Sequence, residues 1–225
     1  FMERLTLVIP AKNESESLPK VLEELKTFDL KVIVVIPKND ELTKESIKNF
    51  NCKIIEEQNG QGYGNALRTG ISNVETDLFC IFNADGSFNP IYLKDMIDLI
   101  TNEKSDFVFC SRYEKSGGSD DDTFLTYIGN KIFTFLCNIL FNLNISDVLF
   151  TYVLGKTNKY KELVLTSNDF SFCVELPIKA KFNKFNLSSM PSYERSRIAG
   201  VKKVNEFKDG FLILISILKL LIFRK

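Results

Sequence analysis

Residues 77–90, Asp-Leu-Phe-Cys-Ile-Phe-Asn-Ala-Asp-Gly-Ser-Phe-Asn-Pro, decide the fold of this chain. The apolar run 78–82 predicts a buried strand, and it ends in a polar turn that holds Asn83 and Asp85. In an open α/β sheet, ligands bind just beyond the carboxyl ends of the strands. A carboxylate at that place, two residues from a second oxygen ligand, suits a hard divalent cation and a diphosphate. The stretch therefore predicts an α/β fold and an enzyme that uses a nucleotide sugar.

Apolar runs alternate with helical patterns through the first half of the chain. This alternation is typical of βαβ units and indicates an open, mostly parallel, Rossmann-like sheet flanked by helices. Right-handed crossovers then bring the carboxyl ends of the strands to one edge. The predicted strands are 5–10, 31–37, 52–56, 77–82 and 106–111, and the predicted helices are 15–28, 41–50, 63–74 and 90–101.

The second half of the chain has a different pattern. A loop rich in Gly, Ser and Asp precedes a strongly apolar helix at 124–142. Further on we expect a short strand at 148–154, a helix near 158–165 and an extended segment at 186–197. The last apolar run, 211–223, predicts a C-terminal helix of roughly 20 Å, too short for a hydrocarbon core of ~30 Å. It either lies in a membrane interface or packs on the sheet.

Composition excludes several classes of function. The formal net charge of the 225 residues is +0, which argues against a sequence-independent grip on nucleic acid. The chain contains no histidine, which excludes histidine-based metal sites, histidine general bases and Ser-His-Asp triads. The five cysteines are scattered without a Cys-x-x-Cys pair, a pattern typical of reduced core thiols in a cytosolic protein.

Two candidate ligand sites precede predicted helices. The first follows the first strand, where Glu14 and its neighbouring backbone are candidates to hold a nucleoside; the same residue types also suit the start of a helix. The second is the run 59–66, Asn-Gly-Gln-Gly-Tyr-Gly-Asn-Ala. Glycines such as Gly60 and Gly62 let the backbone approach a ligand, and a helix N-terminus favours anions.

Two further candidate sites carry charge. Asp85 is the predicted metal ligand, with Asn83 and Ser87 as neutral helpers. Arg112 follows the predicted strand 106–111, and Arg197 lies six residues before Lys203. Guanidinium and ammonium groups suit phosphate oxygens and departing diphosphates. We therefore expect all four sites to meet at one edge of the sheet.

Taken in order and spacing, these segments resemble family 2 inverting glycosyltransferases of the GT-A fold. They are most similar to the subgroup that contains dolichyl-phosphate mannose synthase and its bacterial polyprenyl-phosphate relatives. The resemblance runs from about residue 5 to the end of the chain. The matching segments are 8–14 (Val-Ile-Pro-Ala-Lys-Asn-Glu), 60–70, 83–85 with Pro90, 111–113, Gly129-Asn130, Ser146-Asp147, Glu175 and 193–203.

The resemblance implies transfer of a sugar from a nucleoside diphosphate to a polyprenyl phosphate. Asp85 would hold Mg²⁺ or Mn²⁺ on the diphosphate, and Arg112, Arg197 and Lys203 would bind the acceptor phosphate and the departing diphosphate. With Asp147, these residues make the implied catalytic set Asp85, Arg112, Asp147 and Arg197. The other implied substrate-binding residues are Pro10, Ala11, Asn13 and Glu14 in the nucleoside pocket, and Gly60, Gly62, Asn83, Ala84 and Glu175.

Some positions depart from the family pattern and leave alternatives open. Asn83 replaces a usual Asp, which removes one charge from the metal site, and Ile36-Pro37 replaces an Asp-Asp pair. One alternative is a transferase that acts on a glycan hydroxyl, which needs a base, with Asp147 as the candidate. Another is a paralogue that binds a nucleotide without turnover. A nucleotidyltransferase fits less well, because the chain has no Gly-rich basic loop after the first strand.

The resemblance also predicts how the chain is organised. Residues 1–203 form the transferase domain, with a nucleotide-sugar-binding half at 1–113 and an acceptor-binding half at 114–203. Residues 204–225 form the C-terminal helix. Together with the helix at 124–142, this last segment would dock against the membrane surface that carries the lipid acceptor. The protein is accordingly expected to be peripheral on the cytosolic face of a membrane.

Overall fold

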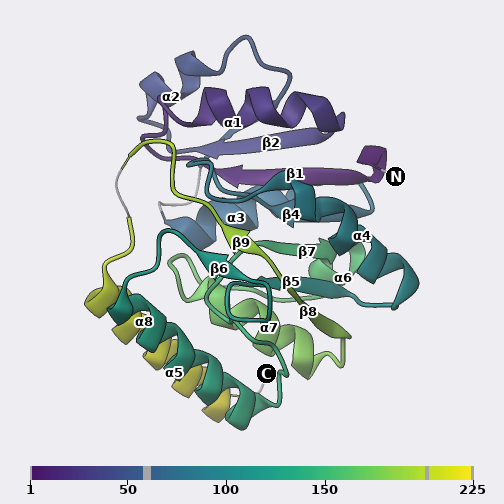
Figure 1. The fold of residues 1–225 in the computed structure, drawn as a ribbon, viewed down its shortest axis with the longest axis vertical. Helices are drawn as coiled ribbons and strands as arrows, with labels where there is room; N and C mark the ends of the chain where they lie inside the picture. The colour runs from purple at the N-terminus through teal and green to yellow at the C-terminus, as the bar shows by residue number, and fades with distance from the viewer. Residues whose placement is uncertain (1, 58–61, 201–202, 224–225) are drawn as a thin grey trace.

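The computed structural model of the chain describes residues 2–57, 62–200 and 203–223. Within them, a seven-stranded sheet has the order β3-β2-β1-β4-β7-β5-β8, and a two-stranded ribbon pairs β6 with β9 (Figure 1). Only β7 runs antiparallel to its neighbours, so the predicted open, mostly parallel sheet is confirmed. The strands are β1 (Leu5–Pro10), β2 (Lys31–Ile36), β3 (Lys53–Glu56), β4 (Leu78–Ile81), β5 (Phe107–Ser111), β6 (Gly118–Ser119), β7 (Val153–Lys156), β8 (Leu187–Pro191) and β9 (Tyr193–Glu194).

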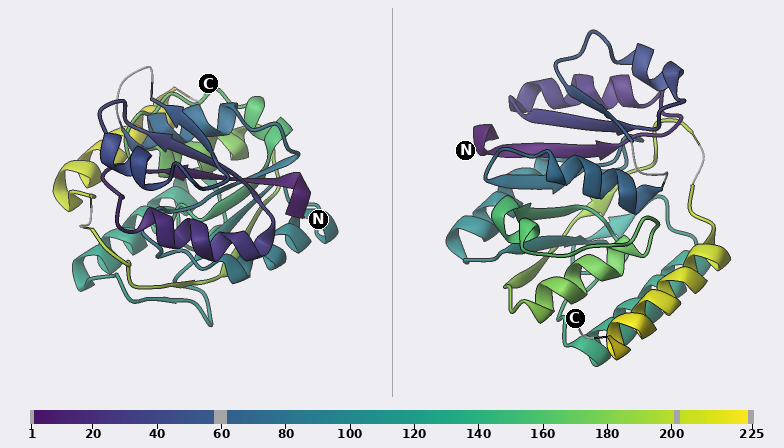
Figure 2. Two further views of the ribbon diagram at one scale, coloured as in Figure 1. Left: turned by 90° about the horizontal axis from the view of Figure 1, so that it is seen from above. Right: turned by 180° about the vertical axis from the view of Figure 1, so that it is seen from behind.

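Helices cover both faces of the sheet (Figure 2). One face packs on α1 and α4, and the other packs on α3, α6 and α7. Beyond α7, helices α5 and α8 lie side by side. The α-helices are α1 (Leu18–Leu25), α2 (Glu41–Ser46), α3 (Tyr63–Ser72), α4 (Leu93–Asn102), α5 (Phe124–Phe141), α6 (Thr157–Lys161), α7 (Phe172–Phe182) and α8 (Glu206–Ile222).

The central strands are apolar on both sides because both faces of the sheet are buried. In β1, Leu7 and Ile9 pack in the core beneath α1 and α4, while Val8 packs on the opposite side beneath α3. This pattern explains why β1, β2 and β4 read as continuous apolar runs instead of alternating ones. Because β1, β2, β3 and β4 are parallel, their carboxyl ends meet at one edge of the sheet.

The strand predicted at 148–154 is displaced in the structure, where β7 starts only at Val153. The preceding apolar residues belong to an aromatic cluster instead of a ladder. Tyr152 stacks on Phe88 with ring centroids 4.6 Å apart, and its hydroxyl donates to the carbonyl of Asn89 at 2.8 Å. Burial of aromatic rings therefore produced a sequence pattern that resembles a longer strand.

The C-terminal run forms helix α8, which packs on α5 and α7, and its position in a membrane interface stays a prediction. Ile213, Ile217 and Leu220 are buried against the body of the protein. The opposite side, which includes Phe207 and Phe211, is exposed. Among the described residues, the helix whose length and composition would suffice to span a membrane is α5, of which 22% is buried, and not the C-terminal helix.

Candidate active site

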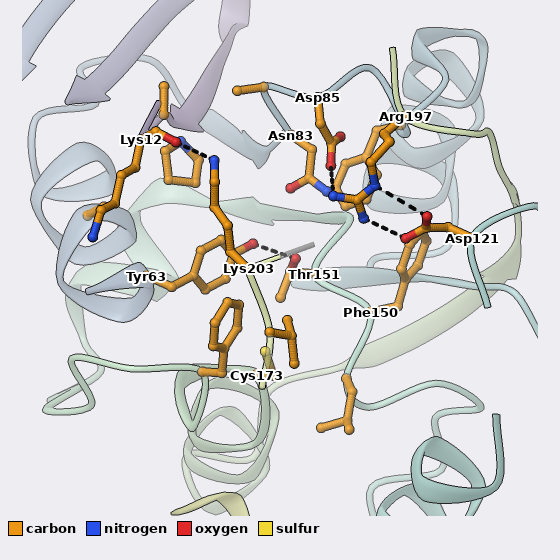
Figure 3. Close-up of a pocket in the computed structure, with 18 of the residues that line it drawn as sticks. Lys12, Tyr63, Asn83, Asp85, Asp121, Phe150, Thr151, Cys173, Arg197 and Lys203 are labelled. Atoms are coloured by element: carbon orange, nitrogen blue, oxygen red, sulfur yellow. Dashed lines mark hydrogen bonds and ion pairs between the residues drawn. The ribbon is translucent and has the colours of Figure 1, made fainter. Parts of the chain in front are cut away.

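A cavity of about 420 Å³ lies at the carboxyl ends of the central strands (Figure 3). Its walls come from the turns after β1, β2, β3 and β4 and from the segments around Asp121, Phe150 and Arg197. The N-terminal part of α5 and the middle of α8 also reach it, through Asn130 and Ile213. The cavity thus occupies the strand edge at which open α/β sheets bind ligands.

The turn after β1 brings Pro10, Ala11 and Glu14 to the cavity, as expected. The carboxylate of Glu14 accepts a hydrogen bond from the hydroxyl of Ser17 at 2.6 Å and pairs with the ammonium group of Lys203. Asn13 is not among the lining residues. It has a φ of 55°, and its N–H donates to the carboxylate of Asp40 at 2.5 Å, so it shapes the turn from behind.

The turn after β4 presents one carboxylate. Oδ1 of Asp85 accepts the N–H of Ser87 at 3.0 Å, and the amide of Asn83 donates to the hydroxyl of Ser87 at 3.2 Å. Asn83, Ala84 and Asp85 line the cavity, whereas Ser87 is only 2% exposed and lies beneath the turn. The bond from Ser87 fixes the Asp85 side chain, whose other oxygen, Oδ2, lies 3.9 Å from Nη1 of Arg197.

The donor set at this turn fits a divalent cation only together with a substrate. No group of three or more Cys, Asp or Glu side chains among the described residues could hold a metal ion by itself. Mg²⁺ is commonly bound through one or two carboxylates, substrate phosphates and waters. Asp85 and the carbonyl oxygen of Asn83 therefore suit a cation that arrives with a diphosphate, and Ser87 would reach it only from below the turn.

Two cations from the segment after β9 line the cavity: Arg197 faces the turn after β4, and Lys203 faces the turn after β1 (Figure 3). Arg197 donates to Asp121 through Nη2 at 2.6 Å and through Nε at 3.3 Å. That hydrogen bond is the main reason that the pKa of Arg197 is raised. Lys203 pairs with Glu14 and also donates to the carbonyl of Lys12. A diphosphate at Asp85 would thus have an arginine and a lysine within the same cavity.

Arg112 reaches the cavity wall but is held by carboxylates on every side. Its Nε and Nη2 donate to the two oxygens of Asp147 at 2.8 and 3.1 Å, and Nη1 lies 3.4 Å from Asp122 and 3.3 Å from Glu194. Burial lowers the pKa of Arg112, but the charge of Asp147 and these hydrogen bonds outweigh it, so the pKa is raised. The guanidinium also lies 4.6 Å from the ring centroid of Phe150.

Asp147 itself is fully buried and does not line the cavity. Both of its oxygens accept hydrogen bonds from Arg112. To serve as a general base, Asp147 would have to release Arg112, and this arrangement gives little support to a reaction that needs Asp147 to take a proton.

The described part of the glycine-rich segment packs against another stretch of backbone, the 166–169 loop. Gly60 lies outside the described residues. Gly62 has a φ of 144°, and a Cβ there would lie 2.2 Å from the carbonyl oxygen of Asn168. At Gly64 a Cβ would lie 2.5 Å from the carbonyl oxygen of Ser167. The glycines therefore allow the 166–169 loop to pack on the start of α3, where the N–H of Asn65 donates to the carbonyl of Asn168 at 3.1 Å.

Glu175 supports this loop and is not among the residues that line the cavity. Its carboxylate accepts the N–H groups of Thr166 and Ser167 at 2.9 and 2.8 Å and pairs with Lys179 at 2.8 Å. A direct contact of Glu175 with substrate remains a prediction. Its position instead suits a residue that orients the loop beside Gly62 and Tyr63.

The structure also adds lining residues that the sequence did not suggest. Tyr63 donates to or accepts from the hydroxyl of Thr151 at 2.6 Å and stacks on Phe170. Asp121 lies in a loop without periodicity, so no sequence pattern could indicate that it pairs with Arg197. Glu57, in contrast, directly follows β3, and the strand-end argument used for Asp85 would have found it.

Comparison with known proteins agrees with the fold. The family described as Glycosyl transferase family 2 matches residues 6–164. A dolichyl-phosphate hexose transferase of Haloferax volcanii is 26% identical over 217 residues, which cover 96% of this chain and 92% of that protein. A UDP-N-acetylglucosamine–dolichyl-phosphate N-acetylglucosaminyltransferase of Methanococcus voltae is 24% identical over 208 residues, which cover 82% and 83% of the two chains.

A solved structure has the same fold at low sequence identity. Glucosyl-3-phosphoglycerate synthase from Mycobacterium tuberculosis, in complex with Mn²⁺, UDP-glucose and phosphoglyceric acid, superposes with a TM-score of 0.75 and 14% identity. The match covers 96% of this chain and 79% of that one. The predicted GT-A architecture is thereby confirmed. Because the family match extends over more than half of the sequence, the chain belongs to glycosyl transferase family 2 and is a glycosyltransferase of the GT-A fold.

Proposed function

We propose that this glycosyltransferase moves a sugar from a nucleoside diphosphate to a polyprenyl phosphate at a membrane surface. One observation carries the proposal: a cavity that holds Asp85, Arg197 and Lys203 is walled on one side by two helices with an exposed apolar surface. Family 2 relatives named as dolichyl-phosphate sugar transferases support it.

The charges of the cavity suit a single displacement with inversion at the sugar carbon. An oxygen of the acceptor phosphate attacks the anomeric carbon, the bond from that carbon to the diphosphate breaks, and the nucleoside diphosphate leaves with the electron pair. A phosphate is already ionised near neutral pH and needs no general base. Arg197 and Lys203 would stabilise the charge that develops on the departing diphosphate. A Mg²⁺ or Mn²⁺ ion held by Asp85 and Asn83 would supply further positive charge there.

The α5–α8 face is the proposed membrane-binding surface. We define it as the exposed apolar stripes Phe124, Ile128, Ile132, Phe135 and Ile139 on α5 and Phe207, Phe211, Leu214, Leu218 and Ile222 on α8. Each stripe recurs at helical spacing, so each helix presents one continuous apolar side. Exposed apolar areas of this kind mark interaction sites, and helices with one such side lie in the plane of a membrane interface.

The two helices contribute to the cavity as well as to the α5–α8 face. Thr126 and Asn130 of α5 and Ile213 of α8 line the cavity. A lipid phosphate that leaves the bilayer beside these helices would thus meet Arg197 and Lys203 directly. This arrangement favours helices that lie on the bilayer over a helix α5 that spans it, because spanning would remove α5 from the cavity wall.

The predicted division of the chain fits this proposal. The nucleotide-sugar half, 1–113, supplies Glu14 and Asp85, and the half at 114–203 supplies Asp121 and Arg197. Helix α8, within the predicted segment 204–225, contributes one stripe of the α5–α8 face. We assign the protein to the cytosolic side of the membrane, where nucleotide sugars are made.

A transfer assay tests the reaction. Labelled nucleotide sugars are incubated with a polyprenyl phosphate in detergent, and label in the organic extract is counted. Asp85→Ala should lower the transfer by about 100-fold or more, since charge stabilisation at the reacting diphosphate would be lost. Asp98→Asn, an exposed acid on α4, serves as the control and should leave the rate unchanged. Full activity of Asp85→Ala, or transfer only to a soluble sugar, would contradict the proposal.

Vesicle flotation tests the α5–α8 face independently of catalysis. The Phe135→Asp and Phe211→Asp variants, each with one charge in the α5–α8 face, should lower the partition onto lipid vesicles by about 10-fold or more. Leu42→Asp is a matched control, because Leu42 is 77% exposed on α2, away from these helices. Equal partition of all three variants and the wild-type protein would rule out this face as the membrane contact.

A further inference from the structure

Glu57 is a buried acid that lacks a hydrogen-bond partner for one of its oxygens. The residue is 8% exposed, and its Oε2 is buried with no hydrogen bond. Most buried polar groups in proteins are paired, so each exception calls for an explanation. Among the described side chains, the other buried oxygens in this state are the hydroxyls of Thr157 and Ser192, which are not among the residues that line the cavity. Glu57 lines it.

Glu57 lies at the opposite end of the cavity from Asp85, where the diphosphate is proposed to bind. Its N–H donates to the carbonyl of Ile36 at 3.0 Å, which fixes it at the carboxyl end of β3 next to the end of β2. In the order β3-β2-β1-β4, three strand spacings, about 14 Å, separate β3 from β4, the strand that leads to Asp85. In a nucleoside diphosphate bound along this row, the ribose follows the phosphates and the base lies farthest away. Glu57 therefore faces the base.

The surroundings of Glu57 leave its carboxylate available to a ligand. Burial raises its pKa, and the charge of Lys12 only partly opposes this effect. By comparison, the preceding residue, Glu56, points away from the cavity and pairs with Lys44 at 2.5 Å. Two adjacent glutamates thus have opposite environments: Glu56 is paired at the surface, and Glu57 is buried with one oxygen that has no hydrogen-bond donor.

A carboxylate accepts hydrogen bonds and donates none, so it selects a base that offers N–H groups. Guanine offers two adjacent N–H groups that can meet both oxygens of one carboxylate. Uracil offers one N–H between two carbonyl oxygens, which a carboxylate repels. Cytosine offers an amino group beside a ring nitrogen that is itself an acceptor. We propose, on the basis of the donor site proposed above, that Glu57 binds the nucleobase and selects guanine nucleotides.

Replacement by glutamine inverts the chemistry at this position. The amide of Glu57→Gln has one acceptor and one donor. It therefore matches uracil or cytosine, each of which offers a donor beside an acceptor. Opposite the two adjacent N–H groups of guanine, the amide can accept from one, and its own donor faces the other. Sites built to hydrogen-bond a ligand discriminate strongly against ligands that leave their groups unpaired. The variant should therefore change which base is preferred, not merely how well nucleotides bind.

Titration calorimetry with GDP, UDP and CDP measures this preference, using the wild-type protein, Glu57→Gln and the control Glu56→Gln. The wild-type protein and Glu56→Gln should bind GDP about 10- to 100-fold more tightly than UDP. In Glu57→Gln that ratio should fall by about 10- to 100-fold, with UDP binding retained or improved. Melting curves for each variant establish that it is folded.

The outcomes separate this inference from the proposed function. If all three nucleotides bind and the GDP-to-UDP ratio is the same in wild-type and Glu57→Gln protein, Glu57 does not read the base, although the donor site stands. The same holds if Glu57→Gln weakens GDP and UDP equally, as a purely structural role would. If the folded wild-type protein binds none of the nucleotides, the donor site itself is wrong and the inference fails with it.

Discussion

At the scale of single residues, two buried glutamates show how the number of nearby donors decides the state of a carboxylate. Burial by itself favours the protonated form of both, which acts to raise each pKa. Glu175 receives hydrogen bonds from Lys179 and from the backbone of Ser167 and Thr166, which outweigh burial and lower its pKa. For Glu57 the charge of Lys12 opposes burial but does not outweigh it, so its pKa is raised above the usual value of 4.5. The two acids should therefore affect stability with opposite sign.

Glu57→Gln should stabilise the protein at neutral pH. The folded state disfavours the ionised form of Glu57, so wild-type protein loses stability as pH rises through the raised pKa. The variant avoids this loss, and its gain of about 1 kcal/mol should be present near pH 7.5 and vanish below about pH 4. Urea unfolding at the two pH values measures it. A gain of equal size at both would show that ionisation is not its cause.

Glu175→Gln should destabilise the protein by about 2 kcal/mol at neutral pH, because the ion pair with Lys179 is lost and an amide donor meets the N–H groups of the 166–169 loop. The lowered pKa means that the wild-type contribution is complete above the usual value of 4.5 and disappears as pH falls through the folded-state pKa. The difference between variant and wild type should therefore shrink in acid. A constant difference from pH 3 to 7 would contradict this account.

The sequence predicts those site residues that directly follow a strand. Asp85, Glu14 and Arg112 could be located because polar residues at the end of an apolar run mark the ligand edge of such a sheet. Asp121 could not, since its contact with Arg197 joins two loops that are far apart in the chain and have no periodicity. The role of Asp147 as a hydrogen-bond partner of Arg112 was hidden for the same reason.

At the scale of elements, the contact between the 166–169 loop and the start of α3 shapes one wall of the cavity. The N–H of Asn65 is bound by the carbonyl of Asn168, and Arg68 donates to Thr166 and Asn168. The sequence predicts a ligand-binding turn in the glycine-rich run 59–66, but the described glycines Gly62 and Gly64 are required by the close approach of the 166–169 loop. Whether the turn also binds a phosphate stays a prediction.

Two glycine substitutions separate this requirement from ordinary helix propensity. In Gly64→Ala the Cβ would lie 2.5 and 2.7 Å from the backbone oxygens of Ser167 and Asp169, so the loop must move and stability should fall by about 1–3 kcal/mol. At Gly129, in α5, nothing lies within 4 Å of the added Cβ, and Gly129→Ala should stabilise by up to about 1 kcal/mol. Chemical denaturation of both variants provides the test; destabilisation of similar size in both would refute the steric explanation.

Element boundaries were predictable where one face of the pattern dominated. Strands β1, β2 and β4 appear within one or two residues of their expected positions because their apolar runs are short and bounded by polar turns. The strand predicted to start at residue 148 starts only at Val153, because Phe150 and Tyr152 are buried in an aromatic cluster that includes Phe88. Apolar periodicity reports burial, and a buried loop carries the same signal as a strand.

At the scale of the whole molecule, the apolar core is divided by the sheet into two clusters, and thiols belong to both. Cys80 and Cys110 are buried beneath α1 and α4, and Cys137 lies in the cluster that contains α7 and α8. Burial raises the pKa of Cys137 to about 12, so this thiol stays protonated at neutral pH. All five cysteines are free, and four of them are buried.

The free energy of unfolding should consequently be the same with and without a reducing agent in fresh protein. Buried thiols with raised pKa values are poor nucleophiles, and no disulfide holds the fold together. Equilibrium urea unfolding with and without dithiothreitol measures the difference, and Cys52→Ser tests the half-buried thiol. A loss of more than about 1 kcal/mol on reduction would point to a disulfide that the structure does not contain.

The segment after β9 brings Arg197 and Lys203 to the cavity (Figure 3), and α8 begins three residues after Lys203, at Glu206. One covalent segment thus joins the groups proposed to face the nucleotide to the helix proposed to face lipid. Thermodynamic reciprocity then requires that a nucleotide which alters adsorption to vesicles is itself bound more or less tightly, by the same factor, when vesicles are present.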